Sequence, residues 1–213
     1  VEGNTVHYTD IEGNEQQAQG DKILMSVGRR PVLKGFGLEN IAVEVERGIK
    51  VNGYMQTSLP NVYAAGDVTG FSLLAHTASR EAEVAVNHML GIEDRMEYNA
   101  IPGVVYTNPE VSSVGLTEEQ ATKEGVEYTL HKLPMTYAGR FVAENEGQMG
   151  LCKILVSPDN KVLGVHMLGN PCSEFICAAC MAITNGLTVE QLRRTVFPHP
   201  TVSEILKEGL MNV

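Results

Sequence analysis

Two prolines enclose a histidine near the C-terminal end of this 213-residue chain, in the run Phe-Pro-His-Pro-Thr-Val-Ser-Glu over residues 197–204. Pro200 disfavours helical geometry at the residue before it, which predicts an extended His199 outside any helix. Thr201 can then cap a helix whose third residue is Glu204, the spacing of a capping box. The run therefore predicts an imidazole fixed at a helix start with a carboxylate within reach.

Two interpretations of this run are open. A carboxylate on one ring nitrogen of His199 fixes the tautomer and raises the basicity of the other nitrogen, as a general base near pH 7 requires. The same residues also form an ordinary helix start that carries no chemistry. Ser203 as a nucleophile activated by His199 is a weaker hypothesis, because nothing like a nucleophile elbow surrounds it.

A second candidate site is the run from Tyr63 to Gly70, in which Gly66 and Asp67 follow a predicted strand over 61–65. Ligands of open α/β sheets bind at the carboxyl ends of strands, where an Asp commonly holds a sugar or polyol hydroxyl. A helix predicted from Leu73 would direct its first N–H groups toward a nearby phosphate or ring oxygen. A Gly-Asp pair at a strand end is also a common turn.

Composition and charge argue against several classes of protein. The 16 Lys and Arg against 26 Asp and Glu give a formal net charge of −10, which does not suit a nucleic-acid partner. The longest apolar run, over residues 175–183, is about half of what a bilayer span needs. No signal-peptide pattern opens the chain. Four cysteines fit a reducing interior, so we expect a cytoplasmic α/β protein without a membrane partner.

Three of the four cysteines fall in one apolar, Ala-rich run. Cys177 and Cys180 form a CxxC without the second pair of a zinc site and without the strand-to-helix turn of a thioredoxin motif. Cys172 and Cys177 would stand about 7.5 Å apart along a helix, beyond the roughly 7 Å limit for a disulfide. The run is therefore expected to be a packed helix, and Cys152 a core residue. We predict no metal site.

Turn residues, caps and hydrophobic periodicity predict the order of the elements. The expected strands are an N-terminal hairpin turning at 13–14, a buried strand over 22–27, short strands over 49–51, 61–65 and 104–106, and a hairpin of 153–156 with 162–167. The expected helices cover 73–90, 173–185, 189–194 and 202–210, with another beginning at Thr117. Thr117 and Thr188 each have a Gln three residues later, which is a capping-box spacing. A polar stretch over 93–99 is the candidate domain boundary.

Six motifs occur in the order and spacing of a known family: Gly28-Arg-Arg-Pro31, Ala64-Ala-Gly-Asp-Val68, Leu74-Ala-His76, Thr107-Asn-Pro-Glu-Val111, Val114-Gly-Leu-Thr117 and His199-Pro-Thr-Val-Ser-Glu204. The chain resembles the flavin-dependent pyridine-nucleotide disulfide oxidoreductases, and most strongly their dihydrolipoamide dehydrogenase branch. Members begin with a flavin-binding Gly-x-Gly-x-x-Gly and a Cys-x4-Cys redox disulfide, followed by a second dinucleotide fingerprint. This chain has none of these, so the resemblance implies the C-terminal portion of such an enzyme.

The resemblance implies an α+β fold. Residues 101–213 would form the interface (dimerisation) domain, an antiparallel sheet with flanking helices. Residues 1–31 would be the C-terminal remnant of the NAD-binding domain, and residues 32–100 the central segment that completes the FAD site.

The resemblance also implies roles for individual residues. Gly28 would lie near the nicotinamide nucleotide, and Asp67 would bind the ribityl chain of FAD. His199 would be the proton acceptor and Glu204 its partner, serving the disulfide and flavin of the opposite subunit of a homodimer. The flavin would be lined by Leu73, Leu74, Ala75 and His76. The other histidines (His7, His88, His131 and His166) are expected to be structural or solvated.

The activity implied is oxidation of protein-bound dihydrolipoamide to lipoamide through a redox disulfide and FAD, with reduction of NAD. The partners implied are a second subunit and the lipoyl domains of 2-oxoacid dehydrogenase or glycine cleavage complexes. One departure is Phe197, which stands where some members have a second histidine. A glutathione or mercuric type of disulfide reductase is the alternative. The isolated chain is expected to be an inactive dimerisation module that binds no FAD.

Overall fold

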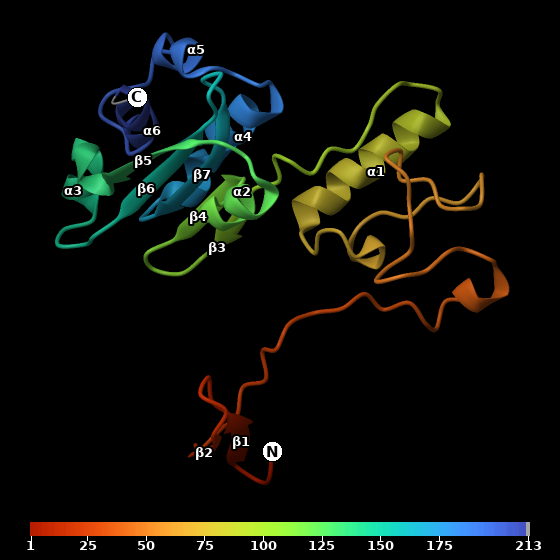
Figure 1. Cartoon of the computed structure of the whole chain (residues 1–213). Coiled ribbons are helices and arrows are strands. Elements are labelled where there is room, and N and C mark those ends of the chain that lie inside the picture. Colours follow the sequence, from red (N-terminus) through yellow and green to blue (C-terminus); the bar gives the residue numbers. More distant parts are fainter. Residues whose placement is uncertain (212–213) are drawn as a thin grey trace. The chain divides into compact units, whose positions relative to one another are not determined.

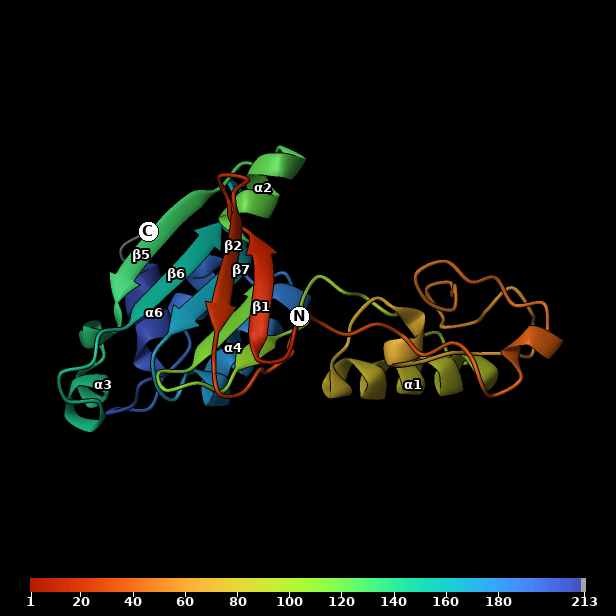
Figure 2. The same cartoon turned by 90° about the horizontal axis from the view of Figure 1, so that it is seen from below.

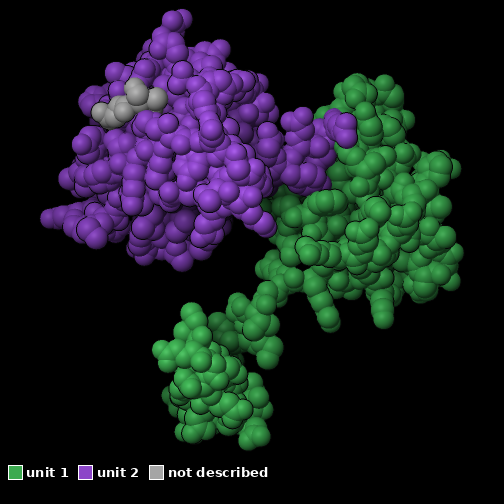
Figure 3. Space-filling view, viewed as in Figure 1, with its two compact units in different colours: residues 1–94 green, residues 95–213 purple. Residues whose placement is uncertain are grey.

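The chain divides into two compact units, residues 1–94 and residues 95–213 (Figure 3). The structure is a computed structural model that describes residues 1–211. The first unit combines a β-hairpin, irregular segments and one long helix. The second unit holds a five-stranded sheet with its helices (Figure 1).

An antiparallel hairpin opens the first unit, as the sequence predicts. It consists of β1 (Thr5–Thr9) and β2 (Glu15–Gln19). Asp10 organises the turn, because its Oδ1 accepts hydrogen bonds from the backbone N–H groups of Asn14, at 2.9 Å, and Glu12, at 3.0 Å. The bond from Asn14 is the foremost cause that holds the pKa of Asp10 below its ordinary value. Local turn chemistry is enough to fix this hairpin.

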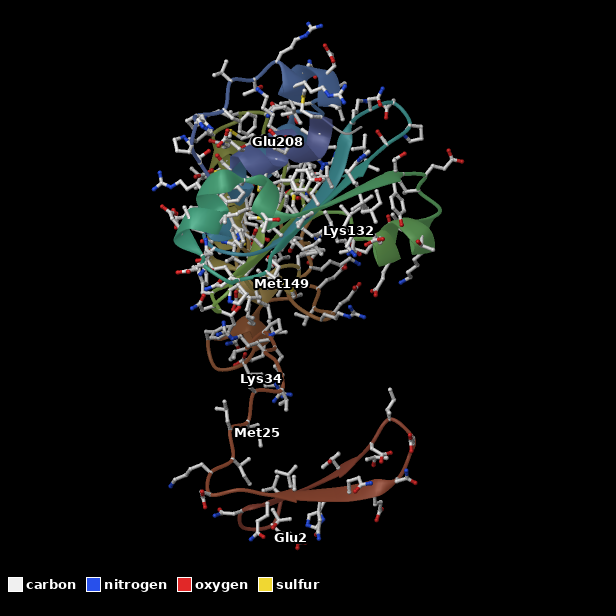
Figure 4. The ribbon with its side chains drawn as sticks, turned by 90° about the vertical axis from the view of Figure 1, so that its left-hand side faces the viewer. Glu2, Met25, Lys34, Lys132, Met149 and Glu208 are labelled. Atoms are coloured by element: carbon white, nitrogen blue, oxygen red, sulfur yellow. The ribbon has the colours of Figure 1, made fainter. Side chains whose placement is uncertain are left out.

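Three predicted strands are absent from the first unit. Residues 22–27 form no strand, and Leu24 and Met25 are 89% and 73% exposed (Figure 4 labels Met25). The runs 49–51 and 61–65 make only isolated bridges, between Val45 and Ile49 and between Gln56 and Tyr63. An apolar run becomes a strand only where a second edge offers it a ladder of hydrogen bonds. Within residues 1–211 the run 22–27 pairs with no strand, and the other two runs make a single bridge each.

The principal helix of the first unit is α1 (Ala75–Met89), which confirms the helix predicted over 73–90. It buries Thr77, Glu81, Val84 and Ala85, which share one face at helical spacing. Gly91 follows the helix with a φ of 74°, the left-handed geometry expected of a residue just past a helix end. Two short 3₁₀ turns, η1 (Leu38–Asn40) and η2 (Asp67–Thr69), precede α1.

The second unit is built on an antiparallel sheet with the strand order β3-β4-β7-β6-β5 (Figure 1). The expected hairpin of β6 with β7 is present and turns at residues 157–160, where the backbone N–H of Lys161 donates to the hydroxyl of Ser157 at 2.9 Å. The strands are β3 (Gly103–Val105), β4 (Val111–Gly115), β5 (Thr129–Pro134), β6 (Leu151–Val156) and β7 (Val162–Leu168).

Two helices of the second unit, α2 and α5, begin where the sequence places their caps. Thr117 and Thr188 both form complete capping boxes with the Gln three residues later. The cysteine-rich run is helical, as predicted. The helical elements are α2 (Glu118–Glu124), η3 (Met135–Tyr137), α3 (Gly139–Glu144), α4 (Cys172–Thr184), α5 (Val189–Arg193) and α6 (Glu204–Met211).

A single hydrophobic core lies between the sheet and the helices. Helix α4 packs against β4 and β7, whereas α6 packs against β5 and β6, and Figure 2 shows both helices behind the sheet. Ile154 of β6, Ile176 of α4 and Ile205 of α6 are at most 3% exposed and belong to this core. The antiparallel α+β architecture expected for this part of the chain is therefore observed.

Two glycines face each other where β4 meets β7. Gly115 has a φ of 76° and pairs with Gly164. A Cβ atom on Gly164 would overlap the carbonyl group of Leu116. The same carbonyl oxygen lies 2.9 Å from Nε2 of His166, so this corner of the sheet leaves no room for a side chain at residue 164.

Candidate active site

His199 lies on the loop between α5 and α6, and its side chain is 82% exposed. Its peptide bond to Pro200 is cis. Nδ1 of His199 lies 2.9 Å from Oε1 and 3.2 Å from Oε2 of Glu204, so the contact expected from the sequence is present. Because an ionised carboxylate only accepts hydrogen bonds, Nδ1 carries the hydrogen, and Nε2 of the neutral ring keeps the lone pair. The pair therefore presents a proton acceptor to solvent.

The first turn of α6 differs from the predicted capping box. The helix begins at Glu204, whereas the sequence predicted Glu204 as the third helical residue after a cap at Thr201. The backbone N–H of Thr201 donates to Oε2 of Glu204 at 2.9 Å, as in a capping box. The Thr201 hydroxyl, however, donates to the carbonyl oxygen of Pro198 at 2.8 Å. The helix therefore begins two residues later than the predicted start at Val202.

Hydrogen bonds to the Glu204 carboxylate favour its ionised form. The N–H of Thr201 is the largest cause, followed by the imidazole of His199, and together they lower the pKa of Glu204 below its ordinary value of 4.5. The carboxylate is 21% exposed, much less than the imidazole that it holds. Glu204 is thus a charged partner near neutral pH. Ser203 contacts Thr201, with the two hydroxyl oxygens 2.9 Å apart.

The second candidate site lies in the first unit, around Asp67. Gly66 has φ 83° and ψ −158°, a conformation essentially restricted to glycine. Its N–H donates at 2.6 Å to Oε2 of Glu81, a fully buried carboxylate on α1. Asp67 follows with an exposed side chain at the start of η2. The strand predicted to end here is absent, so Glu81 rather than a sheet fixes the backbone before Asp67.

The residues expected to line the flavin gather at the start of α1. Leu73 and Leu74 are half-buried, whereas Ala75 and His76 are exposed. Leu74 is the N-cap and forms no side-chain hydrogen bond to the first turn. The helix start therefore presents backbone N–H groups, which suit an electronegative ligand atom. The exposed Asp67 carboxylate can accept a hydrogen bond from a sugar hydroxyl, and the N–H groups of this helix start can donate to a phosphate or ring oxygen.

Glu81 is a site residue that the sequence analysis missed. Glu81 lies on the buried face of α1, together with Thr77, Val84 and Ala85. A charged residue within the apolar stripe of a helix is unusual, because burying a carboxylate without hydrogen bonds is costly. The charged residue at position 81, within the apolar face of the helix, was the sequence signal that could have identified it.

The structure gives Gly28 no defined surroundings. It is exposed, its φ is 109°, and it lies in a stretch without regular secondary structure. A Cβ atom there would meet nothing within 4 Å. The role implied for Gly28 by the resemblance stays a prediction.

Cys152 and Cys172 are core residues and Cys180 packs against the core, whereas Cys177 lies outside it, contrary to the buried position expected for this run. All four are free thiols. Burial raises the pKa of Cys152 to about 12 and that of Cys180 to about 11, and it also raises the pKa of Cys172. Only Cys177 is exposed. Within residues 1–211, no group of His, Cys, Asp and Glu side chains is arranged to hold a metal ion, and no helix there is long and apolar enough to cross a membrane.

Two of the remaining histidines make contacts of a structural kind, and a third is partly buried. Nε2 of His166 lies beside the Leu116 carbonyl oxygen, and Nδ1 of His88 lies 2.8 Å from the hydroxyl oxygen of Tyr63. Burial, assisted by the charge of Arg193, lowers the pKa of His131. These environments differ from the exposed ring of His199 with its carboxylate partner.

Comparison with curated proteins finds dihydrolipoyl dehydrogenases. The chain is 43% identical over 200 residues to dihydrolipoyl dehydrogenase from Thermus scotoductus, covering 92% of this chain and 43% of that protein. It is 39% identical over 203 residues to dihydrolipoyl dehydrogenase 3 of Pseudomonas putida, covering 94% of this chain and 43% of that protein. The human mitochondrial dihydrolipoyl dehydrogenase is 40% identical over 192 residues, which are 89% of this chain and 38% of the human protein. The chain thus spans about two fifths of the length of these relatives.

Solved structures give the same result. LpdA from Mycobacterium tuberculosis superimposes with a TM-score of 0.85 at 27% identity, covering 99% of this chain and 46% of LpdA. The Cu(II) complex of RclA, an HOCl-induced flavoprotein disulfide reductase from Escherichia coli, superimposes with a TM-score of 0.84 at 27% identity. The match covers 99% of this chain and 48% of RclA.

Two family profiles match the chain. Residues 101–210 match the dimerisation domain of pyridine nucleotide-disulphide oxidoreductases, and residues 1–82 match the pyridine nucleotide-disulphide oxidoreductase profile. The antiparallel sheet, the His199–Glu204 pair and the Gly66–Asp67 turn lie within these matches. The chain belongs to the pyridine nucleotide-disulphide oxidoreductase family, whose members use FAD and NAD.

Proposed function

We propose that this chain is the C-terminal portion of a dihydrolipoamide dehydrogenase and supplies its proton acceptor and its dimer interface. The observation that carries this proposal is the hydrogen bond of 2.9 Å between Nδ1 of His199 and Oε1 of Glu204, on an imidazole that solvent can reach. The dihydrolipoyl dehydrogenase names of the relatives support the substrate. The dimerisation-domain match supports a homodimer.

The proposed role of His199 is to take a proton from a dihydrolipoyl thiol. The thiolate, not the thiol, is the nucleophile that attacks a disulfide. Nε2 of His199 accepts the thiol proton, and Glu204 stabilises the resulting imidazolium through Nδ1. The dithiol is oxidised to lipoamide as a cysteine disulfide of the whole enzyme is reduced. That disulfide lies outside this chain, whose own cysteines are not placed for the task.

The first unit is proposed to complete the cofactor sites of the whole enzyme. When bound, FAD would pass the electrons on to NAD. Asp67 would hold a ribityl hydroxyl, and Leu73, Leu74, Ala75 and His76 would line the flavin. Gly28 would lie near the nicotinamide nucleotide. On this proposal residues 1–31 belong to the NAD-binding domain, residues 32–100 to the FAD-binding segment and residues 101–213 to the interface domain.

Partners and location follow from the same proposal. The lipoyl domains of 2-oxoacid dehydrogenase or glycine cleavage complexes would deliver the substrate. A cytoplasmic location is proposed from the sequence, whereas the human and Caenorhabditis elegans relatives are named as mitochondrial.

The proposal is tested by His199→Gln in the full-length enzyme that carries this C-terminal portion. We expect lipoamide-linked turnover to fall by roughly 10²- to 10⁴-fold, the range for loss of a general acid–base group. Reduction of an artificial dye by NADH needs no thiol proton transfer, so it should remain near the wild-type rate. Equal loss of both activities would show that His199 has only a structural role.

A second disulfide substrate distinguishes the proposal from its alternative within the family. The structural match to the disulfide reductase RclA makes the comparison necessary. Steady-state kinetics with lipoamide and with glutathione disulfide should give the higher kcat/KM for lipoamide. Preference for glutathione disulfide, or for a mercuric ion, would replace the proposed substrate without removing the proposed proton acceptor.

A further inference from the structure

The exposed imidazole of His199 depends on its own loop for its position. Its side chain is 82% exposed, so core packing does not fix it. The loop over residues 198–203 must therefore hold both the ring and the carboxylate through hydrogen bonds. Thr201 is the residue of this loop that contacts the backbone before His199 and also the carboxylate of Glu204.

We propose that Thr201 is a positioning residue that fixes the His199–Glu204 pair through its hydroxyl and its backbone N–H. The inference rests on the proposed function of His199 and extends it to a residue that does not touch the substrate. In this arrangement Thr201 acts on the proton acceptor only through its neighbours.

The hydroxyl of Thr201 closes the loop around His199. Its oxygen lies 2.8 Å from the carbonyl oxygen of Pro198, to which it donates its only hydrogen. It also lies 2.9 Å from the hydroxyl oxygen of Ser203. Because the Thr201 hydrogen is already used, Ser203 is the donor in that second bond. Thr201 thus ties the residue before His199 to the residue before Glu204.

The backbone of Thr201 holds the other half of the pair. Its N–H donates at 2.9 Å to Oε2 of Glu204. Nδ1 of His199 lies nearest to Oε1 of Glu204, at 2.9 Å, so the imidazole and the Thr201 N–H each bind a different oxygen of the carboxylate. The carboxylate is held in the orientation that receives the imidazole hydrogen. A rotation of Glu204 would break both bonds together.

Ordinary helix capping does not account for the Thr201 hydroxyl. In the capping boxes of α2 and α5, the hydroxyls of Thr117 and Thr188 accept from the backbone N–H three residues later, at 3.1 Å and 3.3 Å. The Thr201 hydroxyl donates backward along the chain, to Pro198. The Thr201 hydroxyl therefore closes the loop that carries His199 instead of capping the helix.

Thr201→Val removes the hydroxyl and keeps the backbone N–H and the side-chain shape. We expect lipoamide-linked turnover of the full-length enzyme to fall by roughly 3- to 10-fold, the effect of losing one hydrogen bond. Dye reduction and the KM for lipoamide should stay unchanged. Thr201→Ser retains the hydroxyl and should restore turnover. Thr195→Val is a matched control, because it removes another loop hydroxyl, which binds the Gln191 carbonyl oxygen at 3.3 Å.

A second readout needs no turnover. Nitrogen-15 NMR of the His199 ring in this chain reports which nitrogen carries the hydrogen. The wild type and Thr201→Ser should show the hydrogen at Nδ1, whereas Thr201→Val should show a mixture of both tautomers. If Thr201→Val fails to fold, Thr201→Ala removes the hydroxyl without a branched side chain.

The outcomes separate this inference from the proposed function. Wild-type turnover and tautomer in Thr201→Val would overturn the positioning role, and so would a Thr201→Ser variant as impaired as Thr201→Val. Either result leaves the proposed function standing as long as His199→Gln abolishes lipoamide-linked turnover. A His199→Gln variant with normal turnover would overturn the proposed function itself.

Discussion

At the scale of single residues, the chemistry depends on a difference in exposure between two neighbours. His199 is almost fully in solvent, whereas Glu204 is only 21% exposed and accepts hydrogen bonds from two directions. The exposed group can meet a thiol from another molecule, and the more sheltered group stays ionised and in place. A hydrogen bond to a charged acceptor is stronger than one between neutral groups, which favours a carboxylate here over an amide.

Glu204→Gln should therefore lower lipoamide-linked turnover of the full-length enzyme, by about tenfold, while dye reduction is unchanged. The glutamine oxygen can still accept from Thr201 or His199, but it no longer stabilises an imidazolium by charge. Glu208→Gln, on the same helix and outside the pair, is the matched control. A wild-type rate for Glu204→Gln would contradict the role of the carboxylate.

The same substitution should change how stability depends on pH. A carboxyl group with a lowered folded-state pKa contributes stability above its unfolded value, here 4.5, and this contribution is lost as the pH falls through the folded pKa. In urea unfolding of this chain, the wild type should exceed Glu204→Gln in stability at pH 6, and the difference should disappear as the pH falls through the folded-state pKa of Glu204. A difference independent of pH would show that ionisation of Glu204 does not contribute.

At the scale of elements, α4 separates exposed from protected thiols. Cys177 is exposed on this helix, whereas Cys172 is buried and Cys180 is half-buried with a pKa of about 11. Cys152, on β6, has a pKa of about 12, so roughly one thiol in 10⁴ is ionised at pH 8. Because the thiolate is the reactive form, one cysteine of the four should react quickly.

Titration of the native chain with a chromogenic disulfide reagent at pH 8 should show one fast thiol per chain. Cys177→Ser should remove that fast phase, and Cys180→Ser, the matched variant on the same helix, should retain it. Addition of denaturant should release the other three thiols. Two fast thiols in the native state would contradict the burial of the remaining cysteines.

The close packing where β4 meets β7 predicts that a side chain at residue 164 destabilises the sheet. Gly164→Ala would place a methyl group against the carbonyl of Leu116, so the strands must separate or bend. We expect a loss of about 2–4 kcal/mol in the free energy of unfolding, in the range of strongly destabilising single changes. Gly139→Ala is the control, because its Cβ meets nothing within 4 Å. Equal denaturation midpoints for both variants would contradict the close approach at residue 164.

Elements that are specified locally could be predicted from the sequence, and elements that need a distant partner could not. The Thr117 and Thr188 caps and the hairpin turn at residues 13–14 carry their hydrogen bonds within a few residues. The runs 22–27, 49–51 and 61–65 have strand composition, but a strand also needs an edge to pair with. The run 22–27 lacks a partner strand, and the runs 49–51 and 61–65 pair only through single bridges, which are too short to form a strand ladder.

The same distinction applies to the candidate sites. His199 and Glu204 are five residues apart, so sequence spacing predicted their contact, which the structure shows at 2.9 Å. The cis peptide bond at Pro200 and the backward hydrogen bond of Thr201 were not predicted, because they depend on the closed shape of the loop. Glu81 was missed for a similar reason, since its bond to Gly66 spans 15 residues.

At the scale of the whole molecule, the second unit has a hydrophobic core of its own, whereas the first unit carries residues that we propose for part of a cofactor site. The core joins the sheet to α3, α4, α5 and α6, as an independently folded interface domain requires. The first unit leaves the apolar residues of segment 22–27 in solvent. On the proposed function, Asp67 and the start of α1 would form one side of a ligand site, in a chain that covers about two fifths of a relative's length.

The purified chain should therefore be colourless and inactive. We expect no flavin absorption band after incubation with FAD, and no NADH-dependent reduction of lipoamide or dye, because most of the length of the relatives is outside this chain. Sedimentation of the same sample should show self-association through the second unit. A yellow chain that retains FAD through gel filtration would contradict this prediction and would place more of the cofactor site within residues 1–94.

The buried Glu81 carboxylate has a practical consequence for protein engineering. Because it anchors the amide that precedes Asp67, cutting the loop away from the middle of α1 removes the hydrogen bond that joins the two. Transplanting the short Gly-Asp segment into a foreign framework would carry over the residues but lose the geometry. A graft would have to include the long helix as well, at least as far as residue 81.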